Sequence, residues 1–191
     1  MQIYNIIFVF NYFCILKFVT DPCDQAIQYL IEIMKYAKLT KEQFEELNEE
    51  FAVFLSAQHI DAKEWANIKD KKPDLAEKEL EVFSDFVWER VLSKANYLDH
   101  FSPNTLNLFK CEADSIERIV VKLNKEVIYL MNELDFNWFL DNSKDPRIEY
   151  LKGKKEYAQE RNTEIFDLIQ KGGVVSQGQL FEAIKKMISA R

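Results

Sequence analysis

Glycine and proline are scarce in this chain, with four of each among 191 residues. All-β folds use both residues in their many tight turns, so the low counts disfavour such folds and favour helices. Histidine is scarcer still, because His59 and His100 are the only two. A structural zinc site usually takes four Cys or His ligands at short spacings, and the sequence holds no such cluster. The composition therefore predicts a helical protein that binds no metal.

The cysteines are also few, and they lie at Cys14, Cys23 and Cys111. An odd number at irregular spacing is not a disulfide framework and is typical of a reducing compartment. A chain of this length buries about two-thirds of its unfolded surface and needs no cross-links to be stable. We therefore expect a cytoplasmic protein.

Motifs for phosphate binding and nucleophilic catalysis are missing as well, since the sequence has no Walker loop, no GxGxxG turn and no GxSxG elbow. The basic run Lys152–Lys155 lacks the glycine pattern of a phosphate loop, and we interpret it as a solvated turn. Asp99-His100 is interpreted as a histidine packed at a helix end or loop, rather than as a catalytic base. We therefore predict no cofactor and no catalytic residue.

Acidic residues outnumber basic ones, which gives a formal net charge of −7 and a pI near 5.0. Such a charge repels nucleic acid and anionic membranes. It is unevenly spread, because residues 34–143 carry 14 Lys and Arg against 22 Asp and Glu, whereas residues 144–191 carry 10 against 7. Nucleic-acid binding is therefore not expected, except through the basic C-terminal part.

Residues 1–33 differ from the rest of the chain. The only strongly apolar run, Ile3 to Val19, is shorter than the ~20 residues of a transmembrane helix and is interrupted by Asn5, Asn11 and Lys17. It lacks the basic start and the cleavage site of a secretory signal. As part of a core it would have to be buried on all sides, because it has no polar face.

A mis-assigned start codon is the interpretation that we favour for this segment. Fourteen of its first nineteen residues are Phe, Tyr, Met, Ile, Asn or Lys, the residues of AT-rich codons, as in translated non-coding DNA. A helical pattern opens directly afterwards, at Met34. We therefore predict that residues 1–33 are an extension and that residues 34–191 form a single globular helical domain. An apolar membrane anchor at residues 3–19, a signal and a core element stay open.

Helical patterns cover most of the chain after Met34. Thr40-x-x-Gln43 is a capping box, and the apolar residues that follow it at helical spacing predict a helix from Thr40 to Gln58. Between Tyr97 and Leu123 the period changes to that of two short strands joined through Glu112–Ser115. Capping residues and apolar spacing predict further helices from Asp61 to before Pro73, and over Asp74–Lys94, Val127–Leu140, Arg161–Lys171 and Ser176–Ser189, while Glu149–Glu160 is ambiguous. The predicted fold is mainly α, a single compact helical domain with a short β-hairpin near residues 106–123.

Several blocks of the chain, in order, are similar to a known family: MKYAKLTKEQFEELNEEFAVFL (34–55), FSDFVWERVL (83–92), YLDHFS (97–102), NLFKC (107–111), RIVVKLN (118–124) and EIFDLIQKGG (164–173). From Met34 to the C-terminus the chain resembles an uncharacterised family of short cytoplasmic proteins from Bacteroidota, a domain of unknown function. Its members begin at the methionine that is Met34 here, so the resemblance implies that residues 1–33 lie outside the family pattern. It implies no activity, cofactor or catalytic residue.

The first predicted helix is rich in glutamate, at Glu42, Glu45, Glu46, Glu49 and Glu50. These residues make three like-charge pairs four residues apart, and each such pair costs about 0.2–0.5 kcal/mol on an exposed helix. A solvated face and a docking face for a basic protein partner both fit this pattern.

The function that we expect is a non-enzymatic cytoplasmic protein-interaction or regulatory module, with these five glutamates as the candidate partner-binding residues. One alternative is a small enzyme with a dispersed active site, which carboxyl groups of perturbed pKa in a deep pocket around His100 would favour. The other is a helix-turn-helix nucleic-acid binder that uses residues 161–191, whose two predicted helices flank Gly172–Ser176.

Overall fold

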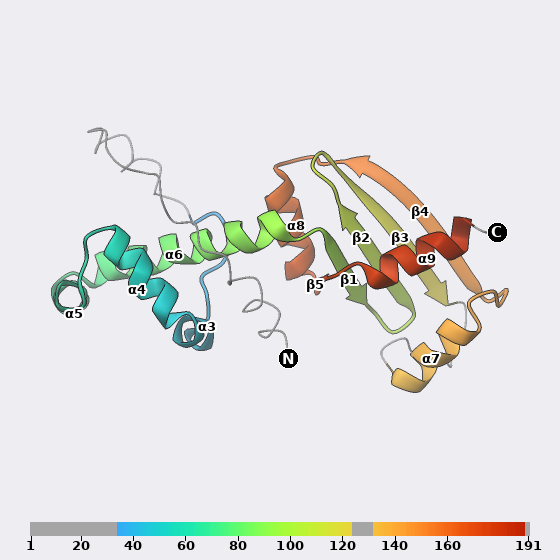
Figure 1. The fold of residues 1–191 in the computed structure, drawn as a ribbon, viewed down its shortest axis with the longest axis horizontal. Coiled ribbons are helices and arrows are strands. Elements are labelled where there is room, and N and C mark those ends of the chain that lie inside the picture. Colours follow the sequence, from blue (N-terminus) through green and yellow to red (C-terminus); the bar gives the residue numbers. More distant parts are fainter. Residues whose placement is uncertain (1–33, 124–131, 190–191) are drawn as a thin grey trace. The chain divides into compact units, whose positions relative to one another are not determined.

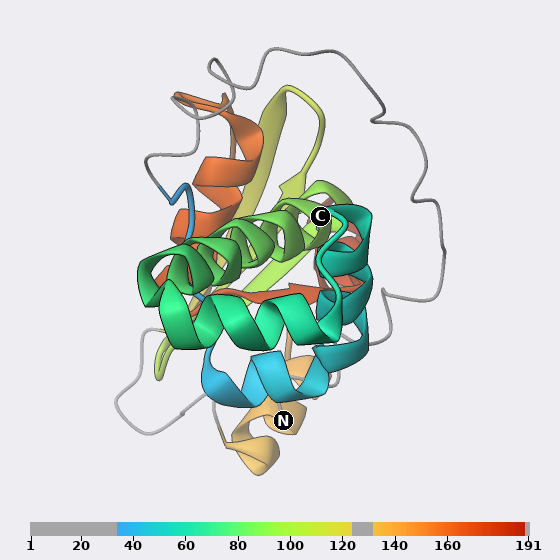
Figure 2. The ribbon, with the colours of Figure 1, turned by 90° about the vertical axis from the view of Figure 1, so that its left-hand side faces the viewer.

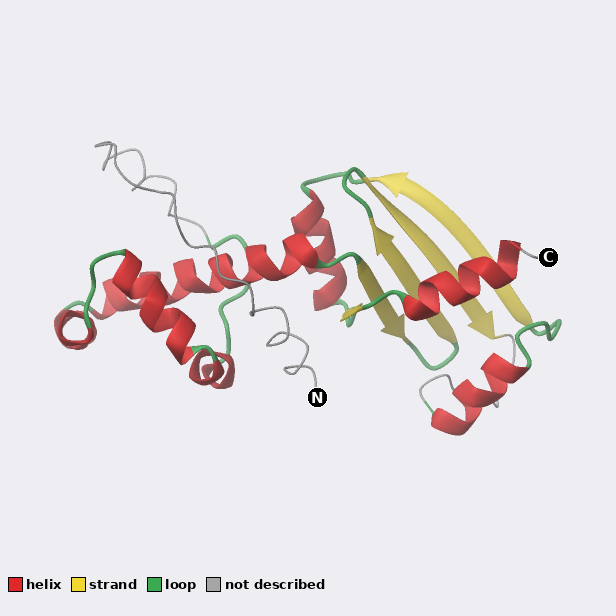
Figure 3. Ribbon diagram, viewed as in Figure 1, coloured by secondary structure: helices red, strands yellow, loops and turns green. Residues whose placement is uncertain are grey.

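A computed structural model describes residues 34–123 and 132–189 of the chain. They divide into two compact units, with the boundary between Val91 and Leu92. The described elements of the first unit are helices, whereas the second combines helices with a five-stranded sheet (Figures 1 and 3). The predicted extension 1–33, with its apolar run, lies outside the described residues.

The described part of the first unit, residues 34–91, is built from four helices (Figure 2): α3 (Lys41–Glu46), α4 (Asn48–Ala57), α5 (Ala62–Lys71) and α6 (Pro73–Lys94), whose last turn crosses the unit boundary. The predicted capping box at Thr40 is confirmed, because the Gln43 amide donates to the Thr40 hydroxyl and the Thr40 amide donates to the Gln43 side chain. Asp61 likewise caps α5, by accepting from the Glu64 amide at 2.7 Å. Both caps satisfy amides that the helix itself leaves free.

The predicted helix from Thr40 to Gln58 is two helices, because α3 ends at Glu46 and α4 begins at Asn48. The Asn48 side chain donates to the main-chain carbonyl of Glu45 at 2.7 Å, and such local bonds compete with the helical ladder. Leu47 itself is buried in the core of the unit. The break therefore turns an apolar side chain inward and separates the glutamates of α3 from those of α4.

Aromatic rings fill the core of the first unit around Phe83, which is fully buried. The rings of Phe44, Phe51 and Phe54 lie 5.0–6.0 Å from it between centroids, the spacing of favourable aromatic pairs. The extended segment that precedes α3 is held by α6, since the Asp85 carboxylate accepts from the amides of residues 35 and 36 at 2.6 and 2.9 Å.

The second unit is built on an antiparallel sheet in the order β4-β3-β2-β1-β5. Its strands are β1 (Tyr97–Phe101), β2 (Thr105–Cys111), β3 (Ser115–Leu123), β4 (Ile148–Glu156) and β5 (Val174–Ser176), and its helices are α7 (Glu133–Asp141), α8 (Arg161–Gln170) and α9 (Gln179–Ser189). The predicted hairpin near residues 106–123 is present as β2 and β3, at the centre of this sheet. The prediction of a mainly helical fold is wrong, because the protein is α+β.

The sequence did not predict the strands β1, β4 and β5, and the physical reason differs for each. β1 is short and carries Asp99-His100 in its middle, which hides its alternation. β4 is an edge strand whose last six residues are exposed, so the basic run Lys152–Lys155 is part of a strand and not a solvated turn. Lysines are a common protection of sheet edges against further pairing. β5 has only three residues.

The two faces of the sheet differ. Leu106, Leu108, Ile119 and Val121 are fully buried, and they form the core of the unit with apolar residues of α7 and α9. Side chains alternate between the faces along a strand, so the residues between them point to the other side. That second face is the one on which α8 lies.

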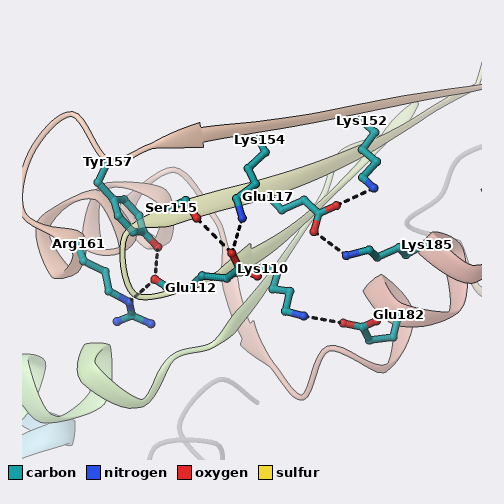
Figure 4. Close-up of polar contacts among 10 residues, drawn as sticks. All are labelled: Lys110, Glu112, Ser115, Glu117, Lys152, Lys154, Tyr157, Arg161, Glu182 and Lys185. Atoms are coloured by element: carbon teal, nitrogen blue, oxygen red, sulfur yellow. Dashed lines mark hydrogen bonds and ion pairs between the residues drawn. The ribbon is translucent and has the colours of Figure 1, made fainter.

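Glu117 is a buried carboxylate on the core side of the sheet. It accepts from Lys152 at 3.0 Å and from Lys185 at 2.7 Å, so β3 is joined to β4 and to α9 (Figure 4). Burial opposes its ionisation, but the hydrogen bonds from the two lysines outweigh this and hold the pKa of the carboxyl below its usual value.

Replacing this carboxylate tests the arrangement. Glu117→Gln should lower the free energy of unfolding at pH 7 by about 1–3 kcal/mol, because two charge-assisted hydrogen bonds become neutral ones. Since the pKa of Glu117 is lowered in the folded protein, its contribution is complete above the unfolded pKa, near 4.3, and is lost as the pH falls through the folded value. Thermal melts of parent and variant should therefore converge below pH 4.

Glu149→Gln is the matched control, because Glu149 forms an exposed pair with Lys122 between the same two strands, at 3.9 Å. It should change stability by less than about 1 kcal/mol at any pH. Equal effects of the two substitutions at pH 7 would contradict the role of Glu117.

Candidate functional site

A pocket of about 780 Å³ lies between α8 and the second face of the sheet. This volume is within the range of about 300–1,000 Å³ that is usual for small-molecule sites. The strands contribute His100, Asn107, Phe109, Ile116, Arg118, Gly153, Lys154 and Lys155 to its lining, and Ala158, Gln159, Glu164, Asp167, Leu168 and Lys171 come from α8 and its flanks.

Part of the open space in the pocket lies beside a glycine in the middle of a strand. Gly153 lies opposite Arg118 in the pairing of β4 with β3. A Cβ atom at Gly153 would meet nothing within 4 Å, and the backbone there does not need a left-handed conformation. Glycine inside a strand weakens the strand and often marks a place where a ligand approaches. Phe109 and Ile116, both buried, supply an apolar floor beside this opening.

Three polar side chains form a row across β3, β2 and β1. The Arg118 guanidinium donates to Asn107 Oδ1 at 2.5 Å, and Asn107 Nδ2 lies 3.3 Å from His100 Nδ1. Because the Asn107 oxygen is taken by Arg118, its amide nitrogen must face the histidine and donate to Nδ1. The neutral imidazole therefore carries its proton on Nε2, where it is a donor.

Two lysines of the pocket are already paired. Lys154 contacts Glu112 at 2.6 Å and Lys155 contacts Glu164 at 2.7 Å. Burial disfavours the ionised form of Glu164, but hydrogen bonds from Lys155 and from the amides that precede α8 outweigh it and keep the pKa of the carboxyl below its usual value. Glu164 is therefore an anion at neutral pH that holds the start of α8.

Arg118 and Lys171 are the cations that remain. Neither has a carboxylate within ion-pair distance among residues 34–123 and 132–189, and both side chains are exposed. Asp167 is the remaining acid, and it accepts from the Gln159 side chain at 3.0 Å. The pocket thus has a surplus of one positive charge.

Arg161, the first residue of α8, fixes this helix over the sheet. Its guanidinium donates to four main-chain carbonyls, those of Leu92, Ala95, Cys111 and Glu112, at 2.7–3.2 Å. The Tyr157 hydroxyl donates to the same Glu112 carbonyl, as Figure 4 shows. The end of α6, the end of β2 and the start of α8 are therefore joined at one side chain.

A scan against family models matches residues 34–189 to a family of unknown function, DUF6495. The chain belongs to this family. The prediction that the chain from Met34 onwards is an uncharacterised domain is thereby confirmed. A search of curated proteins and a search of solved structures found no match. The family is one of unknown function, so the pocket is the feature of this chain that points to a function.

The five glutamates predicted to bind a partner lie outside this pocket, in the first unit of the DUF6495 region. Glu42, Glu45, Glu46 and Glu49 are exposed and Glu50 is half-buried. Lys41 offsets part of the charge through a contact with Glu45 at 3.7 Å. Only the pair Glu42–Glu46 lies within one helix, since the break at residue 47 separates the other two pairs. A basic partner for these residues stays a prediction.

The predicted helix-turn-helix over residues 161–191 is not formed. α8 and α9 are separated by β5, which pairs with β1 in the sheet. α8 lines the pocket on one face, whereas Phe181 and Ile184 of α9 join the core on the other. Lys185 points to Glu117 and is not free to contact a groove.

His100 lies in a strand, and not at a helix end or in a loop as predicted. Asp99 does not form a catalytic pair with it, because neighbouring strand residues point to opposite faces. Burial raises the pKa of Asp99, although a hydrogen bond from Ser176 opposes this shift. The Oδ1 atom of Asp99 is buried and has no hydrogen-bond partner among the described residues.

Other chemistry finds little support in the described residues. They contain no group of three or more His, Cys, Asp and Glu that could hold a metal. Burial raises the pKa of the Cys111 thiol to about 11, which leaves it unreactive at neutral pH. Within the same ranges no helix is long and apolar enough to cross a membrane.

Arg161 should be a position at which substitution lowers the stability of the second unit. Arg161→Leu removes the donor from four carbonyls and should lower the stability of the unit by about 2–3 kcal/mol. Arg161→Lys should recover only part of this loss, because an ammonium lacks the planar fork. Hydrogen exchange of the β2 and β3 amides in the full chain measures the effect. Arg147→Lys, at a local ion pair with Asp145, is the control, and an effect as large as that of Arg161→Lys would contradict this role.

Proposed function

We propose that this protein is a non-enzymatic binding module and that the pocket beneath α8 is its ligand site. The observation that carries the proposal is Gly153, which leaves open space in the middle of a strand beside an exposed arginine and an apolar floor. A lysine-rich edge strand has no structural need for glycine at this position, whereas a ligand site does.

The charges in the pocket support binding over acid–base catalysis. A general acid at neutral pH needs a carboxyl of raised pKa, and the pKa of Glu164 is lowered by its partners. The lining residues include no Ser, Thr or Cys that could act as a nucleophile. His100 is held through Nδ1 by Asn107, which suits a fixed hydrogen-bond donor. The cytoplasmic location is proposed on the cysteine usage and the resemblance, and the origin in Bacteroidota on the resemblance alone.

Filling the pocket tests the proposal. Gly153→Phe should fold like the parent protein, because the site has room for a side chain and phenylalanine favours strands. A ligand at one hundred times its Kd stabilises a folded protein by about 2.7 kcal/mol. A thermal-shift panel of small metabolites of both charge signs and of none should therefore contain compounds that stabilise the parent protein and Gly153→Ala.

The same compounds should leave the melting temperature of Gly153→Phe unchanged. Stabilisation of Gly153→Phe as large as that of the parent would place the binding site elsewhere and overturn the proposal. A panel without any compound that stabilises the parent would also count against it.

A further inference from the structure

We propose that the pocket is selective for an organic monoanion, a molecule with an apolar body and one carboxylate-like head. This inference rests on the proposed function and adds the chemical class of the ligand. It follows from which polar groups the pocket has already used and which it has left free.

The free polar groups are almost all donors. Arg118 gives one N–H to Asn107 and keeps the others, His100 keeps its Nε2–H, and Lys171 keeps its ammonium protons, since no described residue pairs with it. The acceptors are occupied, because Asn107 Oδ1 binds Arg118 and the Glu164 carboxylate binds Lys155. Acceptor capacity remains on Asp167, which already binds the Gln159 amide nitrogen, and on the Gln159 side-chain oxygen. A ligand must therefore supply acceptors.

The position of Arg118 fits a planar, charged head. Its guanidinium lies over the Phe109 ring, 5.5 Å from the centroid, and the bond to Asn107 fixes its orientation. A guanidinium held in this way offers a fork that matches two oxygens of a carboxylate. The surplus of one positive charge favours a monoanion over a dianion such as a phosphate monoester, because a second negative charge would have no partner.

The body of the ligand must be apolar. Phe109, Ile116 and Leu168 form the apolar part of the lining, and the site opposite Arg118 is empty of any side chain because residue 153 is glycine. A head at Arg118 and a body along these three side chains therefore use the two kinds of surface that the pocket offers.

Two dyes that share an apolar body, one with an anionic head and one without, measure the contribution of the head to binding separately from that of the body. 8-Anilinonaphthalene-1-sulfonate carries one negative charge, and N-phenyl-1-naphthylamine is its neutral counterpart; both fluoresce when bound in apolar surroundings. The full chain should bind the anionic dye more tightly than the neutral one. Arg118→Gln should raise the Kd of the anionic dye by roughly tenfold or more and change the Kd of the neutral dye by less than about twofold. The Kd of the anionic dye for Arg118→Lys should lie between those of the parent and Arg118→Gln.

The controls distinguish the two proposals. Gly153→Phe should abolish binding of both dyes, and unchanged binding of both would overturn the proposed pocket and this inference with it. If Gly153→Phe abolishes binding but Arg118→Gln affects the two dyes equally, the pocket stands and the anion selectivity is wrong. Octanoate should displace the anionic dye better than octyl phosphate or octanamide, and a phosphate that displaces it best would contradict selection of a monoanion.

Discussion

Four main-chain carbonyl groups at the ends of α6 and β2 and just after them meet at one place in the second unit, and the Arg161 guanidinium donates to all four. The last turn of α6, the residue after it and the end of β2 each leave carbonyl oxygens facing the start of α8. A buried carbonyl without a partner costs about 1–3 kcal/mol, so one guanidinium with several such bonds decides how these elements meet. The placement of α8 over the sheet, and with it the roof of the pocket, follows from this contact.

One face of the sheet forms the core of the unit, and the other lines the pocket. Along β2, Leu106 and Leu108 enter the core, while Asn107 and Phe109 between them face the pocket. Because alternation is a property of the strand, one stretch of sequence builds both surfaces. The core face is closed by α7 and α9, and α8 leaves room on the other face beside Gly153. A binding site can therefore exist here without weakening the core.

Local patterns in the sequence predicted the structural features that depend on residues close together in the chain. The capping residues Thr40 and Asp61 mark real helix starts, and the alternation of Ile119 and Val121 marks a real strand. The fold class was missed because β1 and β4 have weak patterns of their own. β4 is stabilised by its pairing with β3 along its whole length, a contact between residues far apart in the sequence.

The pocket could not be predicted in the same way. Its decisive residues, His100, Arg118, Gly153 and Lys171, come from three strands and the end of a helix, with no fixed spacing between them. Gly153 stands in a basic run that also suits a turn, and only the pairing of β4 shows that it opens a space. The one pointer in the sequence was His100, and only within the alternative of a small enzyme with a deep pocket around this residue.

Arg118 is the residue proposed to receive the head of an anionic ligand in this pocket. The most direct test of this proposal is a nuclear magnetic resonance titration of the full, ¹⁵N-labelled chain with octanoate, in which the Nε–H signal of Arg118 is followed. This signal should move and saturate together with the amide signals of Phe109 and Gly153, while the amide signals of α3 and α4 stay in place. Signals of Arg118 and Gly153 that do not move at saturating octanoate would contradict the proposal.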